Sequence, residues 1–150
     1  MAIALSTAGV TVGYASGATK PASGYTEIPD VKSIPEFGSN VNALQSTTLS
    51  ATMNHTYIEG LKDSGGALGL TVNLTDTFMT EWNTLLSAYA AMTSGHQMWF
   101  EIKIPNMAKS FFFPGKPVAL GFGGADVDEV LETTANIIPT GDYEWDTAST

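Results

Sequence analysis

Period-two alternation of apolar and polar residues limits the possible folds of this chain more than any other feature. Apolar side chains occupy every second position in Val10–Tyr14, Leu68–Leu74 and Met98–Ile104. Successive side chains of a strand point to opposite faces, so the pattern predicts strands that each bury one face. Further strands are expected over residues 110–113, 118–122 and about 127–138, with turns at Pro105-Asn106 and Pro139-Thr-Gly141.

One segment follows a helical period instead. Its apolar residues recur at spacings of three and four: Phe78, Met79, Trp82, Leu85, Leu86 and Tyr89. Thr75 or Asp76 can cap the start, and Ser94-Gly95 can end the helix. The sequence therefore predicts one flanking helix over about 76–93, with its apolar stripe packed on a sheet.

Residues 33–55 are rich in Ser, Thr and Asn and predict a long loop. Loops of this length without secondary structure are uncommon in a compact domain, and they are often functional. Two interpretations follow: a surface loop, or an arm that becomes ordered only against a neighbouring subunit.

Composition excludes several classes of protein. A chain of 150 residues has the size of one domain, expected here over 1–150. It contains no cysteine, which excludes disulfides and thiolate chemistry. All six basic residues are lysines and the net charge is −9, so tight binding of nucleic acid is not expected.

The N-terminus carries no charge before Lys20, so it lacks the basic region of a signal peptide. No segment reaches the roughly 20 apolar residues needed to cross a bilayer. We therefore expect synthesis in a cytoplasm and no membrane insertion.

No pattern in the sequence indicates a catalytic, cofactor or metal site. Neither His55 nor His96 has a second ligand at metal-binding spacing. The acidic run from Asp126 departs from a calcium loop, because Leu131 occupies the position that requires glycine. We expect a protein that is not an enzyme. Aromatic residues leave one alternative open, a β-sandwich binding or virion decoration module that recognises host-surface carbohydrate; they are Trp82, Trp99, Phe111–Phe113, Tyr143 and Trp145.

Several segments, in order, resemble the major tail tube family of siphophages, the phages with long non-contractile tails. The matching segments are Tyr25–Pro35, the Ser/Thr step Ser46–Leu49, the expected turn Tyr57–Asp63, the strand Leu68–Asn73 and the ending Val130–Asp142. A related tube from a contractile tail or a secretion apparatus has the same fold, and the sequence does not separate these systems.

The resemblance implies a mostly β fold: a β-sandwich or half-barrel, one flanking helix, a long stacking loop (33–55), and terminal arms at about 1–24 and 139–150. It also implies hexameric rings that stack into a tube, an acidic-lined conduit through which DNA passes without specific binding during genome ejection. The expected partners are further copies of the chain, the tape measure protein and the tail terminator and tip proteins. The expected location is the host cytoplasm during assembly and the virion tail afterwards.

Two sets of residues are candidates for these roles. The acidic C-terminal third suggests a lumen-lining strand face, and the polar loop suggests contacts between rings. The proposed lumen-lining residues are Asp128, Glu132, Thr134 and Asn136. The proposed inter-ring residues are Ser39, Asn40, Asn42, Gln45, Thr47 and Thr48.

Overall fold

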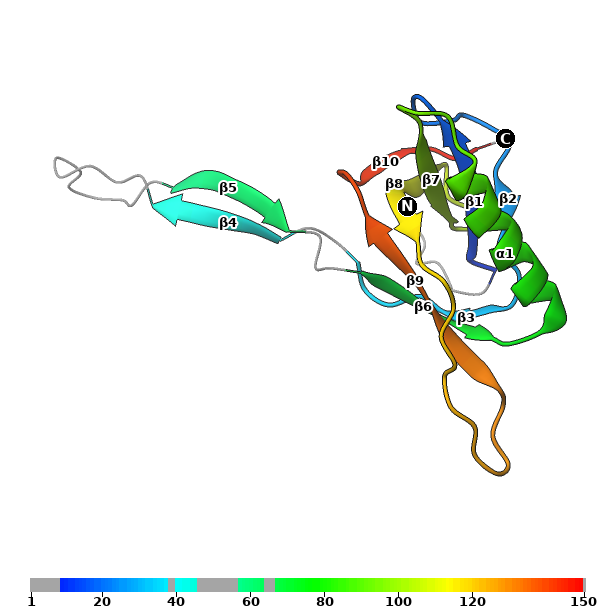
Figure 1. Ribbon diagram of the computed structural model, residues 1–150. Helices are drawn as coiled ribbons and strands as arrows, with labels where there is room; N and C mark the ends of the chain where they lie inside the picture. Colours follow the sequence, from blue (N-terminus) through cyan, green and yellow to red (C-terminus); the bar gives the residue numbers. More distant parts are fainter. Residues whose placement is uncertain (1–8, 38–39, 46–56, 64–66, 150) are drawn as a thin grey trace, which may run out of the picture. The chain divides into compact units, whose positions relative to one another are not determined.

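A computed structural model describes residues 9–37, 40–45, 57–63 and 67–149. The chain divides into two compact units, one of residues 1–35 and 67–150 and a second of residues 36–66. The larger unit is a curled antiparallel sheet with one helix (Figure 1). Its elements are β1 (Thr11–Gly17), β2 (Thr26–Glu27), β3 (Val31–Ser33), β6 (Leu68–Asn73), α1 (Asp76–Ala90), β7 (Gln97–Lys103), β8 (Lys109–Pro117), β9 (Glu132–Pro139) and β10 (Glu144–Thr147).

The strand order shows that the sheet curls on itself. It runs β2-β1-β7-β8-β9-β6-β3, with β10 paired to β8 beside this path. β2 and β3 are therefore the two outer strands, yet they are separated in sequence only by residues 28–30. Four peptide steps span at most about 14 Å, so the two edges lie close together across the open side. Ile28 is buried in this crossing. The expected mostly β half-barrel with one helix is confirmed.

β8 makes the curl possible because its two ends pair with different neighbours. Residues 111–114 pair with β7, whereas residues 115–117 pair with β9. The change falls at Pro114-Gly115. A Cβ added to Gly115 would lie 2.6 Å from Ile137 Cγ2 and 3.3 Å from Phe100, so only glycine allows this close approach.

The core is an aromatic and aliphatic cluster on the inner face. Phe100 and Phe113 stack at 5.5 Å between ring centroids where β7 meets β8. α1 buries Phe78, Trp82 and Leu85, and Trp82 Nε1 donates to the carbonyl of Val118 at 3.0 Å. Thr75 caps the helix, as expected, by accepting from the backbone N–H of Phe78 at 3.1 Å. The helix ends at Ala90 rather than near residue 93.

The smaller unit corrects the prediction of a structureless loop. β4 (Asn40–Gln45) pairs with β5 (Tyr57–Asp63) in an antiparallel hairpin, whose strands lie side by side in Figure 1. The loop predicted over 33–55 thus contains the strand β4. The segment 57–63, expected to be a turn, is the strand β5 that pairs with it. Alternation between asparagine and apolar residues in 40–45 fits a strand, although asparagine is rare in strands.

Two further predictions are wrong. Residues 118–122 form no strand, and β9 begins at Glu132 instead of residue 127, because residues 118–131 make only isolated hydrogen bonds to the sheet, such as Val118 N–H to the carbonyl of Asn136, and no continuous ladder. The predicted terminal arms contain strands in their described parts: β1 pairs with β7, and β10 pairs with β8. The backbone hydrogen bonds of β1 and β10 are therefore made within the sheet.

Gly115→Ala should lower the free energy of unfolding by about 1–3 kcal/mol, because the methyl group meets Ile137 in a packed core. Gly121→Ala is the matched control, since no atom lies within 4 Å of the added Cβ. Urea unfolding measures both variants, and equal stabilities would contradict the role given to Gly115.

Candidate assembly surface

The outward face of β6 and β9 carries a row of polar side chains. Side chains of β9 alternate strictly, with Thr133, Ala135 and Ile137 buried and Thr134 and Asn136 exposed. The register places Thr71 opposite Thr134 and Gly69 opposite Asn136, on the same outward face. A Cβ on Gly69 would lie 3.0 Å from Thr134 Cγ2, so glycine leaves room for the two β9 side chains.

Three of the four proposed lumen-lining residues share this face. Glu132, Thr134 and Asn136 lie on one side of β9. Asp128 does not join them: it lies in a turn before the strand, with a φ of 63°. Whether the face lines a lumen stays a prediction.

The face is mostly neutral rather than acidic. Its acid, Glu132, forms an ion pair with Lys32 of β3. Thr71, Thr134 and Asn136 are polar, and Ile138 at the end of the same face is 45% exposed and lies opposite Lys116 of β8. The face therefore offers neither a cluster of cations nor a large apolar area. The other acids of the C-terminal third lie elsewhere: Asp126, Asp128 and Glu129 in the loop between β8 and β9, Asp142 between β9 and β10, and Glu144 and Asp146 on β10.

Ionic contacts fasten the C-terminal strand to the sheet. Lys20 lies 3.3 Å from Glu144, donates to Asp146, and sits 4.6 Å from the centre of the Phe112 ring. Hydrogen bonds from Lys20, and then from the backbone N–H of Thr147, lower the pKa of Asp146. Burial alone would lower the pKa of Lys20, but hydrogen bonds to Asp146 and Glu144 raise it.

A buried carboxylate holds the residues after β10. Glu101, 2% exposed, accepts hydrogen bonds from the backbone N–H and the hydroxyl of Ser149 at 2.9 and 2.5 Å. Lys103 Nζ donates to the carbonyl of Ser149 at 3.0 Å. Because these partners satisfy Glu101, the group acts as an anchor for the chain end.

The inter-ring candidates fall in the second unit. Asn40, Asn42 and Gln45 belong to β4, and Ser39, Thr47 and Thr48 lie outside the described residues. The aromatic residues considered for carbohydrate binding are mainly core residues. Trp82 and Phe111–Phe113 are buried, whereas Trp145 is 50% exposed and packs edge-on against Phe111.

Sites for chemistry were sought in the same part of the chain. Residues 9–37, 40–45, 57–63 and 67–149 contain no group of three or more His, Asp or Glu that could hold a metal ion. His96 lies in the turn before β7, and His55 is outside the described residues. In the described part, no helix has the length and apolar character to span a membrane.

Sequence reasoning missed the apolar surface of the loop at 118–131. The sequence pattern predicts strands for the residues whose side chains are exposed here: Phe122, Val127, Val130 and Leu131. The paired glycines at Gly123-Gly124 were the sequence signal for a loop here. In the structure Gly123 packs against the backbone of Glu132, where an added Cβ would lie 2.5 Å from the carbonyl oxygen.

Comparison with known proteins places this curled sheet and helix in a fold found in a prophage-encoded assembly. A chain from the cryo-EM structure of the anti-feeding prophage (AFP) baseplate, 6-fold symmetrised, matches with a TM-score of 0.69 and 12% sequence identity. The match covers 100% of both chains, and at this identity it establishes the fold. No family model and no curated protein sequence matches the chain.

The ion pair between Lys20 and Asp146 predicts a dependence on acidic pH. A carboxyl whose pKa is lowered by folding stabilises the folded state above its ordinary pKa of 3.8, and this contribution is lost as pH falls through the folded value. Lys20→Met should therefore lower the free energy of unfolding at pH 6, and the difference from the unaltered protein should narrow below about pH 4.

Urea unfolding between pH 3 and 7 measures this effect. Lys116→Met removes the same charge from an exposed position of β8 and serves as the control. A difference that stays constant with pH would show that Lys20 contributes through packing alone.

Proposed function

We propose that this chain is a structural subunit of a phage-type tail, in which copies form rings that stack into a tube. The observation that carries the proposal is the full-length likeness to a chain of a baseplate determined with six-fold symmetrisation. The resemblance of its segments to siphophage tail tube proteins supports the finer assignment to a non-contractile tail. The chain would act as a building block and not as an enzyme.

Unused strand edges support self-assembly. β2, β3 and β10 lie at the margins of the sheet, and the four residues of β10 are exposed. Exposed edges favour pairing with another chain unless they are covered. In a closed ring every copy would offer its edges to its neighbours, and hexamers are the state that the six-fold baseplate suggests.

The hairpin of β4 and β5 supports stacking between rings. Among the described residues, these strands pair only with each other. An isolated two-stranded hairpin is marginally stable in water, so contact with a second subunit would stabilise it. We therefore keep the inter-ring role proposed for Asn40, Asn42 and Gln45, which lie on the strand β4 and not in a loop.

The outward face of β6 and β9 is the proposed wall of the conduit. A lining of Thr71, Thr134 and Asn136, with Glu132 beside Lys32, offers DNA little to bind. Phosphates would meet no cluster of free cations there, which suits rapid passage. Genome ejection through the tube, contact with a tape measure protein and with terminator and tip proteins, and residence in the virion tail after assembly in the host cytoplasm all belong to this proposal.

Negative-stain electron microscopy of the purified protein tests assembly. We expect rings at low concentration and tubes of constant diameter as the concentration rises, because each added ring buries another stacking surface. Dilution should reverse the growth. A protein that stays monomeric up to millimolar concentration would refute the tube and favour a binding module.

Lysines on the proposed wall should make assembled tubes retain DNA. Thr134→Lys with Asn136→Lys adds two cations per copy to the exposed face of β9, and retention should fall steeply with salt. Asn83→Lys with Ser87→Lys adds the same charge to the exposed side of α1. Co-sedimentation measures how much duplex DNA stays with the tubes of each variant after DNA has passed through them. Equal retention of DNA by the two variants would place the β9 face outside the conduit.

A further inference from the structure

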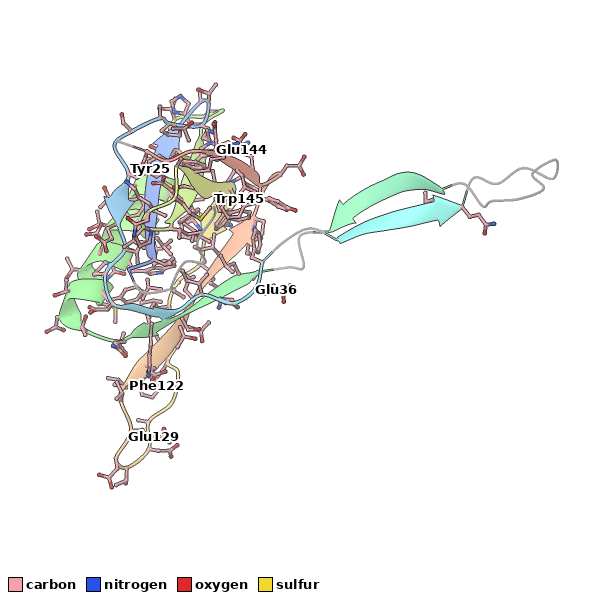
Figure 2. The ribbon with its side chains drawn as sticks, turned by 180° about the vertical axis from the view of Figure 1, so that it is seen from behind. Tyr25, Glu36, Phe122, Glu129, Glu144 and Trp145 are labelled. Carbon is pink, nitrogen blue, oxygen red and sulfur yellow. The ribbon has the colours of Figure 1, made fainter. Side chains whose placement is uncertain are left out.

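The loop between β8 and β9, residues 118–131, presents apolar side chains to solvent. Phe122, Val127 and Val130 are 74%, 88% and 64% exposed. Figure 2 shows Phe122 and Glu129 on this loop, which extends beyond the strands that it connects. Large apolar groups on a protruding loop are unfavourable in water unless another surface covers them.

The base of this loop is fixed, so its side chains are presented from a defined position. The backbone N–H of Val118 donates to the carbonyl of Asn136 at 3.0 Å. The hydroxyl of Thr133 donates to the carbonyl of Gly121 at 2.9 Å. Ordering the loop on binding therefore costs less conformational entropy than ordering a free chain.

The same unit contains an open apolar cavity of about 560 Å³. It lies where the start of β1 and the end of β7 approach β3, and its lining includes Val10, Val31, Lys32, Ile34, Ile102 and Ile104. The five aliphatic side chains are only half-buried. Binding pockets of about 300–1,000 Å³ hold small ligands, so an aromatic side chain with its neighbours fits this volume.

We propose that the β8–β9 loop of one copy of this chain inserts into this cavity of a second copy. The loop does not fill the cavity of its own chain, because its apolar side chains are exposed. Both surfaces are apolar, so their contact removes two unfavourable exposures together.

Charges around the two surfaces are complementary. Asp126, Asp128 and Glu129 surround the apolar side chains of the loop, and Lys32 lines the cavity. Lys32 already pairs with Glu132, but its ammonium group has three N–H donors and can also donate to a second carboxylate. A chain with a net charge of −9 repels its copies, so a lysine at the contact lowers that repulsion locally.

The contact joins different patches of identical chains and is therefore heterologous. Repeated by rotation it closes a ring, and repeated with translation it extends a filament. The inference rests on the proposed ring and tube assembly and identifies one pair of surfaces within it.

Single cysteines test the pairing directly, because the chain contains none. Val127→Cys marks the loop, and Ser33→Cys marks the exposed rim of the cavity. The two variants are mixed and treated with a short bismaleimide. We expect covalent dimers in the mixture, little cross-linking of either variant alone, and a ladder of higher species from the double variant.

Thr84→Cys on the exposed side of α1 replaces Ser33→Cys in the control mixture. Dimers no more abundant than in this control, or a cross-link only within one chain of the double variant, would overturn the pairing. If tubes form in the microscope without the cross-link, the pairing fails and the tube stands. Cross-linked dimers without rings or tubes would refute the tube and retain the contact.

A second measurement uses Phe122→Ala, which removes an exposed side chain and should leave folding intact. We expect the concentration at half-association in analytical ultracentrifugation to rise roughly tenfold, as for a central contact residue. Met79→Ala removes an exposed apolar side chain from α1 and should have no such effect. Equal association of the two variants would contradict an apolar contact through Phe122.

Discussion

The change of partner along β8 is the constraint on which the rest of the larger unit depends. One strand pairs with β7 through residues 111–114 and with β9 through residues 115–117, and Gly115 leaves no room for a side chain at the change. This change of partner lets the sheet curl into a half-barrel around the aromatic core. β9 then pairs with β6, and the alternating side chains of both strands give the pair one buried and one outward face. The candidate assembly surface thus follows from this pairing and alternation.

Much of this architecture follows from the sequence, because its signals are local. Alternation identified β6 and β7, and the three–four spacing with Thr75 identified α1. Alternation failed over 118–131, where Leu120 and Phe122 repeat like a strand but find no neighbour to pair with. Strand pairing is a property of the folded chain, and no period in the sequence reports it. The pairing of β4 with β5 was not predicted, because asparagine is rare in strands and β4 contains two asparagines.

The candidate site was less predictable than the fold. Period-two alternation predicts the face shared by Glu132, Thr134 and Asn136, but it places Asp128 there only if the strand begins at residue 127, and β9 begins at Glu132. The expectation of an acidic lining treated all acids of the C-terminal third alike. In the structure three of them lie in the β8–β9 loop, Glu132 pairs with Lys32, Asp142 lies between β9 and β10, and Glu144 and Asp146 of β10 contact Lys20. Charge counts do not contain these partners, which come from residues about 100 or more positions away.

Exposed apolar side chains and unpaired strand edges both favour contact with a second surface. A monomer that functioned alone would gain stability by replacing Phe122, Val127 and Val130 with polar residues, at no cost to the core. It would also shield β10, whose four residues face solvent. Retaining both features is reasonable only if a second surface removes them from water. The cavity lined by Val31 and Ile102 offers such a surface on every copy, so identical chains can satisfy one another in series.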